Sequence, residues 1–246
     1  MSIDFGRACR DLFSTPNKWM TILGLCVSML IPVAGYMVII GYLARRFMRE
    51  RMGYPPEDFE FTYFAEYLRS GLWPTLAVLV FSVIMVPIAL VCMTPIFLAA
   101  PLMEQSESLG VALMIAGMIF YIIGVTVAGI LCYPVLLRST LTMSFKGGFS
   151  WSFMTSFLRK VGLSLFGYFV LLTLISVPLI MVGYLALVVG AYVVSAWMQF
   201  VLIHLLFQHY DLFLARGGEH IETNPELTRD LLQPTRTPPT LPPAAD

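Results

Sequence analysis

Charged residues are scarce in this chain, and long stretches of it carry none. Only 12% of its 246 residues are charged, whereas 58% are hydrophobic and the mean hydropathy is +0.81. A soluble domain of this length could not cover so much apolar surface. Acidic and basic residues are equal in number, so the net charge gives no reason to expect a nucleic-acid partner. The composition indicates a polytopic integral membrane protein.

The chain also lacks the residue patterns of common enzyme and metal sites. Its four cysteines are scattered without a CxxC pair, which favours buried thiols over disulfides or a metal site. No GxSxG, HExxH, Walker or dinucleotide-binding pattern occurs. We therefore predict no catalytic residues, no cofactor and no metal, and we expect that the protein is not an enzyme.

The apolar run from Trp19 to Phe47 is broken in its middle by Pro32 and Gly35. Each half is shorter than the roughly 20 residues that a membrane-spanning helix needs. Pro32 cannot donate the next helical hydrogen bond, and Gly35 permits a tight reversal. Basic residues flank the run on both sides, and Lys and Arg collect on the cytoplasmic side of short loops. We predict a re-entrant or short helical hairpin whose two ends both lie in the cytoplasm.

Four further apolar segments are predicted to cross the bilayer completely. Leu72–Ala100 and Leu109–Leu137 flank an acidic connector, Pro101–Ser108. Val161–Gln208 is long enough for two spans, and we place its turn near Val182–Tyr184. Every cluster of Lys and Arg then falls on one side. The sequence predicts a multi-pass protein of the cell (inner) membrane with cytoplasmic N- and C-termini.

Amphipathic segments precede the apolar ones and are predicted to lie in the membrane interface as helices. They occur at Ile3–Phe13, Phe61–Leu68 and Phe149–Phe157. The predicted fold class is thus an all-α polytopic membrane protein with four full spans, an N-terminal hairpin and interfacial amphipathic helices. Three degenerate repeat units cover about residues 3–47, 61–137 and 149–210 of a membrane domain spanning residues 1–214, although any two kinked helices rich in Leu and Val also look alike. Residues 215–246 are polar and rich in proline, which predicts a disordered cytoplasmic tail.

One polar face occurs at the cytoplasmic end of the last predicted span. His204, Gln208 and Asp211 share a helical face, and Gln199 lies a little over one turn deeper. Polar groups at membrane depth are costly and often functional. The four residues form a candidate polar cluster. Within it, a metal or proton-relay site could use His204 with Asp211, and an interhelical hydrogen bond at a helix end is the alternative.

Four arginines are candidates for contact with lipid headgroups, namely Arg45, Arg46, Arg49 and Arg138. A basic cluster beside a membrane segment can bind anionic lipid. The alternatives are a general role in fixing topology for the first three and snorkelling to the interface for Arg138.

Several short segments carry a resemblance to a known family. They include Asp4–Ala8, Pro16–Trp19, Leu30–Pro32 with Gly41-Tyr42, Phe149–Phe157, and His204–Tyr210. In their order the chain resembles domain-of-unknown-function family 4013, polytopic membrane proteins of bacteria and archaea. The likeness extends to about Tyr210 and departs at Phe207, where the family tends to place glycine. It implies a membrane fold but no reaction, substrate or site.

Two functional hypotheses remain open from the sequence. The first is a non-enzymatic membrane component that binds lipid, including anionic lipid, or partner membrane proteins. The alternative is a transporter or channel for a small solute or ion, since broken helices in repeated units build the midplane sites of transporters. A third, an intramembrane lipid-modifying enzyme, would need acid–base groups converging near His204 and Asp211.

Overall fold

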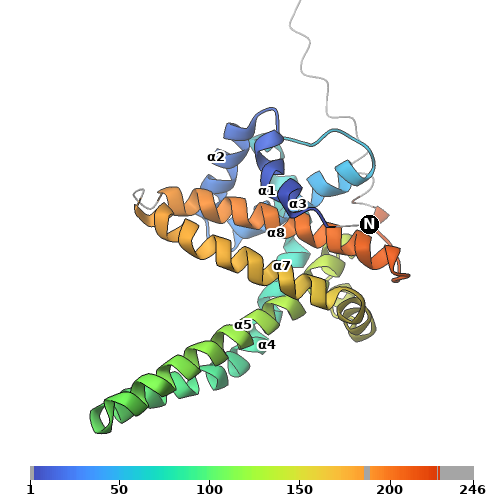
Figure 1. Cartoon of the computed structure of the whole chain (residues 1–246). Coiled ribbons are helices and arrows are strands. Elements are labelled where there is room, and N and C mark those ends of the chain that lie inside the picture. The colour runs from blue at the N-terminus through green and yellow to red at the C-terminus, as the bar shows by residue number, and fades with distance from the viewer. Residues whose placement is uncertain (1–2, 186–188, 226, 228–246) are drawn as a thin grey trace, which may run out of the picture.

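The computed structural model describes residues 3–185, 189–225 and 227, and all regular secondary structure in these residues is helical. Four helices among them are long and apolar enough to cross a membrane, which confirms the predicted all-α membrane fold. They are α4 (Phe64–Gln105), α5 (Glu107–Thr142), α7 (Trp151–Leu185) and α8 (Val189–Ala215). Figure 1 shows a body of packed helices from which the far parts of α4 and α5 project as one long hairpin.

The N-terminal hairpin consists of α2 (Lys18–Met29) and α3 (Ala34–Arg51), so the predicted break falls at the proline as expected. The chain turns so tightly that a Cβ atom on Gly35 would lie 1.7 Å from the carbonyl oxygen of Ser28. The 12 residues of α2 extend for about 18 Å, well short of the ~30 Å of bilayer hydrocarbon. This hairpin is therefore too short to cross a membrane.

Helix α3 forms the centre of the body. Every residue from Val38 to Phe47 is buried, because α2, α4 and α8 pack around it. Its closest neighbour is α4. A Cβ atom on Gly41 would lie 1.9 Å from the carbonyl oxygen of Tyr67, and one on Gly71 would lie 1.7 Å from that of Met37. The two helices thus touch through their backbones, which only glycine allows at these positions.

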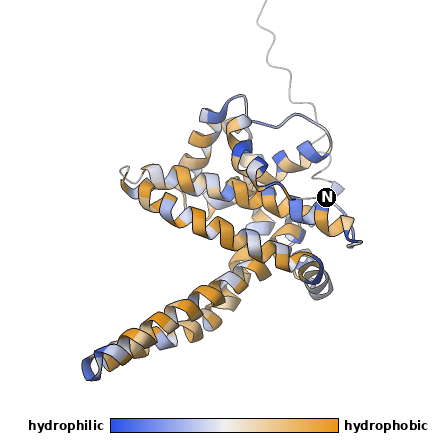
Figure 2. Cartoon of the chain, viewed as in Figure 1, coloured by the Kyte–Doolittle hydropathy of each residue, from blue (hydrophilic) through white to orange (hydrophobic). Residues whose placement is uncertain are grey.

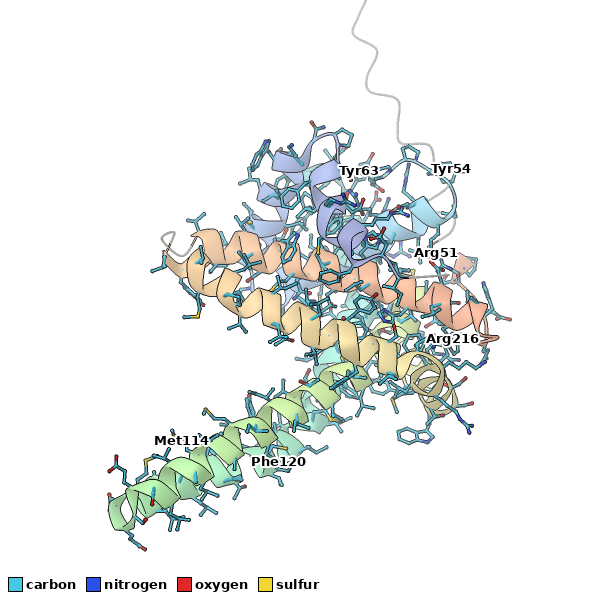
Figure 3. The ribbon with its side chains drawn as sticks, viewed as in Figure 1. Arg51, Tyr54, Tyr63, Met114, Phe120 and Arg216 are labelled. Carbon is cyan, nitrogen blue, oxygen red and sulfur yellow. The ribbon has the colours of Figure 1, made fainter. Side chains whose placement is uncertain are left out.

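The α4–α5 hairpin turns at Ser106, within the acidic connector predicted from the sequence. Its shaft is apolar and its tip hydrophilic, as Figure 2 shows, and the tip carries Glu104 and Glu107. Met114 and Phe120 lie on this shaft, far from Arg51 and Arg216 in the body (Figure 3). The projecting part of the hairpin is therefore apolar except at its tip, and most charged residues lie in the body.

Two sequence predictions about helix boundaries are corrected by the structure. The amphipathic segments at Phe61–Leu68 and Phe149–Phe157 do not form separate interfacial helices but run into the long helices behind them. The first enters α4 through a short 3-10 turn, η2 (Phe61–Tyr63), and the second enters α7 after the short helix α6 (Phe145–Gly148). Helix α7 also continues past the predicted turn to Leu185. Residues 186–188, between α7 and α8, lie outside the described residues.

The first part of the predicted tail, up to residue 225, contacts the body. The amide of Ile221 donates to the hydroxyl of Tyr210 at 2.9 Å, and the amide of Asn224 donates to the carbonyl of Leu141 at 2.9 Å. Ile221 and Leu227 are both buried. The first part of this segment is ordered because it supplies a hydrogen-bond donor to the end of α5 and two apolar side chains to the body. Residues 228–246 of the predicted tail lie outside the described residues.

Candidate functional site

The N-terminal segment crosses the last helix and is fixed there by Gln208. The Gln208 side chain accepts a hydrogen bond from the amide of Asp4 at 2.7 Å and donates one to its carbonyl at 3.1 Å. Asp4 in turn caps α1 (Phe5–Asp11) by accepting a hydrogen bond from the amide of Arg7. This clamp brings the first residues of the chain beside residues 204–212.

His204 lies at the bottom of this junction. It is 5% exposed, its ring packs 4.8 Å from the ring of Phe47, and its Nδ1 lies 3.3 Å from Oδ2 of Asp11. A carboxylate on one ring nitrogen fixes the orientation and the tautomer of an imidazole. Nδ1 is the ring nitrogen that is turned toward Asp11.

Asp211 pairs with Arg51 near the rim of the junction. The guanidinium lies 2.6 Å from the Asp211 carboxylate and 4.9 Å from the centre of the Tyr210 ring. Arg7 forms a second ion pair with Glu50 nearby. Both pairs join α3 to another part of the chain, to α8 in the first case and to α1 in the second.

These residues surround a pocket of about 440 Å³, which we call the junction pocket, between the N-terminal segment, α3 and α8. Its polar lining consists of Asp4, Arg7, Glu50, Arg51, His204, Gln208 and Asp211. Its apolar lining consists of Ile3, Phe47, Phe207 and Leu212. The structure thus brings together three residues of the predicted polar cluster. Gln199 is half-buried, and among the described residues no hydrogen bond joins it to the other three.

The expectation that Arg45 and Arg46 face lipid headgroups is wrong, because both point into the body. Arg45 lies 2.6 Å from Glu66, and its side chain is 5% exposed. Arg46 is fully buried, with Asp11 at 3.6 Å and the ring of Phe200 at 4.9 Å. These two arginines, from which the cytoplasmic side was predicted, therefore join α3 to its neighbouring helices.

Arg49 and Arg138 are also partly enclosed. Arg49 lies 3.7 Å from the Glu57 carboxylate, which is itself buried. Burial raises the pKa of Glu57, although the charges of Arg45 and Arg49 act in the opposite direction. Arg138 lies over the ring of Phe153 at 5.3 Å, beside a polar pocket of about 340 Å³. Arg49 is thus engaged by an acidic partner in the body, whereas the half-buried Arg138 lines this pocket.

Sequence reasoning missed the partners that complete the site. The sequence gives Asp11 only as part of the amphipathic segment Ile3–Phe13, and it gives Glu50 and Arg51 no specific role. The pairs that matter are far apart in the chain, so no local spacing reveals them. One available signal was that each arginine of a buried helix needs a carboxylate or another acceptor.

The hairpins offer few groups for a polar pathway. No Asp, Glu, Lys, Arg or His occurs in residues 70–103, 108–137 or 161–203. Among the described hydroxyls, those of Ser82, Thr94 and Thr173 donate to carbonyls of their own helices. No group of three or more His, Cys, Asp or Glu side chains in the described part of the chain is arranged to hold a metal ion. The transporter alternative therefore gains no support from these segments.

Acidification is expected to remove the stabilising contribution of Asp11. Burial alone would raise the pKa of this carboxyl, but the hydrogen bond with His204 and the charge of Arg46 outweigh it and hold the pKa below its usual range. The contribution is therefore complete above the unfolded-state pKa of about 3.9 and is lost as the pH falls through the lower folded-state pKa. Thermal unfolding in detergent should show that Asp11→Asn melts below wild type at pH 7 and that the gap narrows below about pH 4. A difference in melting temperature between the variants that stays constant down to pH 2.5, more than about one unit below the unfolded-state pKa of about 3.9, would contradict this assignment.

The comparisons with known proteins give one match. A family model described as Protein of unknown function (DUF4013) matches residues 24–195, which is more than half of the chain. The matched region contains Phe47, Glu50 and Arg51 of the junction pocket but ends before His204. No curated protein and no solved structure matches the chain.

Proposed function

The chain belongs to the family described as Protein of unknown function (DUF4013), and from its geometry we propose that it is a non-enzymatic membrane component that binds a phospholipid in the junction pocket. The observation that carries this proposal is the composition of the pocket wall. Charged side chains and apolar side chains line the same cavity, as the boundary between a lipid headgroup and its acyl chains requires.

The apolar side of the pocket supports a lipid rather than a fully polar metabolite. Phe47 and Phe207 stack near each other with ring centres 5.7 Å apart, and Leu212 lies on the same wall. Such a surface suits the glycerol and first methylene groups of a lipid, since each buried CH₂ contributes about 0.8 kcal/mol. The polar side offers Arg7 and Arg51 to a phosphate.

A binding role is favoured over catalysis by how the acidic groups are engaged. His204 and Asp211 line one pocket, but Asp211 is paired with Arg51 and His204 is held by Asp11. A general acid or base needs a group free to exchange protons with the substrate. Each of the two groups already has a partner, which favours binding over proton transfer.

We also propose that the body lies at the cytoplasmic side of the cell (inner) membrane, with both termini there. Basic residues of the loops and helix ends, such as Arg138, Lys146 and Arg159, belong to the body, and the far tip of the α4–α5 hairpin is acidic. Lys and Arg accumulate in cytoplasmic loops. The junction pocket would then open toward the inner leaflet.

Lipid retention tests the proposal. Wild-type protein purified in a mild detergent is expected to carry about one phospholipid per chain in native mass spectra, in keeping with a single headgroup-sized pocket. Arg7→Gln should lower the occupancy roughly threefold, the effect of losing a half-exposed charge contact. Arg159→Gln is the matched control, because Arg159 is an exposed arginine on α7 outside the pocket.

Lipid-free wild-type protein, or a stoichiometric protein partner in place of lipid, would refute the proposal. Equal losses in both variants would refute the location.

A further inference from the structure

The charges of the junction pocket identify the kind of headgroup that it takes. Building on the proposed function, we infer that the pocket selects a zwitterionic headgroup in which a phosphate diester and a primary ammonium group lie a few bonds apart. Phosphatidylethanolamine is the membrane lipid with this chemistry. The inference goes beyond lipid binding because anionic and choline lipids would be discriminated against.

The first argument is that both signs of charge line the cavity. Arg7 and Arg51 are positive, while Asp4, Glu50 and Asp211 are negative. A purely anionic headgroup would lie beside three carboxylates, and like charges in contact disfavour a complex. A purely cationic ligand would meet the two guanidinium groups in the same way. A headgroup with one charge of each sign can satisfy both sets.

The second argument is that the two ion pairs at the pocket can open. The side chains of Arg51 and Asp211 are 28% and 25% exposed, and those of Arg7 and Glu50 are 60% and 26% exposed. Ion pairs in contact with solvent contribute little to stability, so replacing their partners costs little. A zwitterion can therefore replace an arginine–carboxylate pair with two pairs of its own, phosphate to arginine and ammonium to carboxylate.

The third argument comes from His204, which is 5% exposed and lines the pocket. Its Nδ1 lies 3.3 Å from Oδ2 of Asp11, and in the tautomer that carries the proton on Nδ1 the other ring nitrogen, Nε2, is a hydrogen-bond acceptor. An acceptor beside Glu50 and Asp211 suits a primary ammonium, which has N–H bonds to donate. The quaternary ammonium of choline has none, so it cannot make this hydrogen bond.

The experiment compares three lipids that share the same acyl chains and differ only in headgroup. Delipidated full-length protein in detergent is titrated with phosphatidylethanolamine, phosphatidylcholine or phosphatidylglycerol, and bound lipid is counted by native mass spectrometry. We expect phosphatidylethanolamine to bind about tenfold more tightly than phosphatidylglycerol, the size of one avoided like-charge contact. Phosphatidylcholine should bind roughly threefold less tightly than phosphatidylethanolamine because it lacks the donated hydrogen bond. Equal binding of phosphatidylethanolamine and phosphatidylcholine would overturn the primary-amine assignment.

One variant links the selectivity to the pocket. Glu50→Gln removes a carboxylate whose partner, Arg7, is largely exposed, so the fold should be unaffected. It is expected to reduce the preference over phosphatidylglycerol to about threefold. Glu104→Gln, at the exposed hairpin tip, is the matched control. The same change in both variants would overturn the assignment to this pocket.

Two further outcomes separate this inference from the proposal beneath it. Preferential or equal binding of phosphatidylglycerol would overturn the zwitterion selectivity and leave lipid binding intact. Failure of every lipid to bind would overturn both.

Water-soluble glycerophosphoethanolamine is included as a competitor at matched concentration. Displacement of lipid by it at equal affinity would show that the ligand is a soluble compound instead of a membrane lipid.

Discussion

Arg46→Met is expected to lower the free energy of unfolding by about 3–5 kcal/mol, the usual loss when one partner of a buried ion pair is removed. Arg46 is fully buried, donates to the carbonyl of Glu57 at 3.2 Å and lies 3.6 Å from the Asp11 carboxylate. Methionine fills a similar volume but leaves Asp11 without its compensating charge. Thermal or denaturant unfolding in detergent, followed by circular dichroism, measures the effect.

Arg159→Met provides the control for this prediction. Arg159 is exposed on α7, so its replacement should change the free energy of unfolding by no more than about 0.5 kcal/mol. Asp11→Asn combined with Arg46→Met tests the mechanism, because the double variant has no stranded charge. It should be more stable than Arg46→Met alone. A double variant whose losses simply add would show that the two groups do not interact.

Gly41→Ala is expected to destabilise the protein by about 3 kcal/mol, at the upper end of the range for overpacking. The added Cβ would lie 1.9 Å from the carbonyl oxygen of Tyr67, and a backbone atom cannot rotate away as a flexible side chain can. Helices α3 and α4 would have to move apart, opening the packing along the centre of the body. Unfolding in detergent again provides the measurement.

Gly167→Ala is the matched control, since a Cβ at this position on α7 would have no neighbour within 4 Å. It should leave stability unchanged or raise it by up to about 1 kcal/mol, because alanine favours helix more than glycine does. Similar losses for the two substitutions would mean that backbone flexibility, rather than the close approach of α3 and α4, explains the requirement for glycine at residue 41.

The sequence was informative wherever the bilayer constrains it. Continuous apolar length predicts the long helices, and the Pro32–Gly35 interruption predicts the α2–α3 turn, because lipid leaves no other partner for backbone groups. The end of α7 was harder to place. Its neighbourhood is apolar on both sides of the turn, and no charged residue marks the reversal.

The site was predicted only in part, for a reason that the arginines make clear. A rule based on charge reports the side of the membrane on which a residue lies, but not whether it points outward or inward. Arg45 and Arg46 belong to a basic cluster that the rule would place in the cytoplasm, and both are buried. Glu66 and Asp11, which pair with these arginines, and the residues that contact Gln208 and His204 are brought there by tertiary packing between separate helices. The spacing of apolar residues within one helix does not predict such contacts.

The central position of α3 also constrains how the protein is made. Helix α3 leaves the ribosome early, but Phe200, His204 and Asp211, which cover its charged end, are synthesised some 150 residues later. Until α8 is synthesised, the arginines of α3 are not covered by it and must stay in contact with water or with the translocation machinery. Completion of the body therefore waits for the last helix, so a nascent chain stalled before α8 should be a natural substrate for membrane quality control.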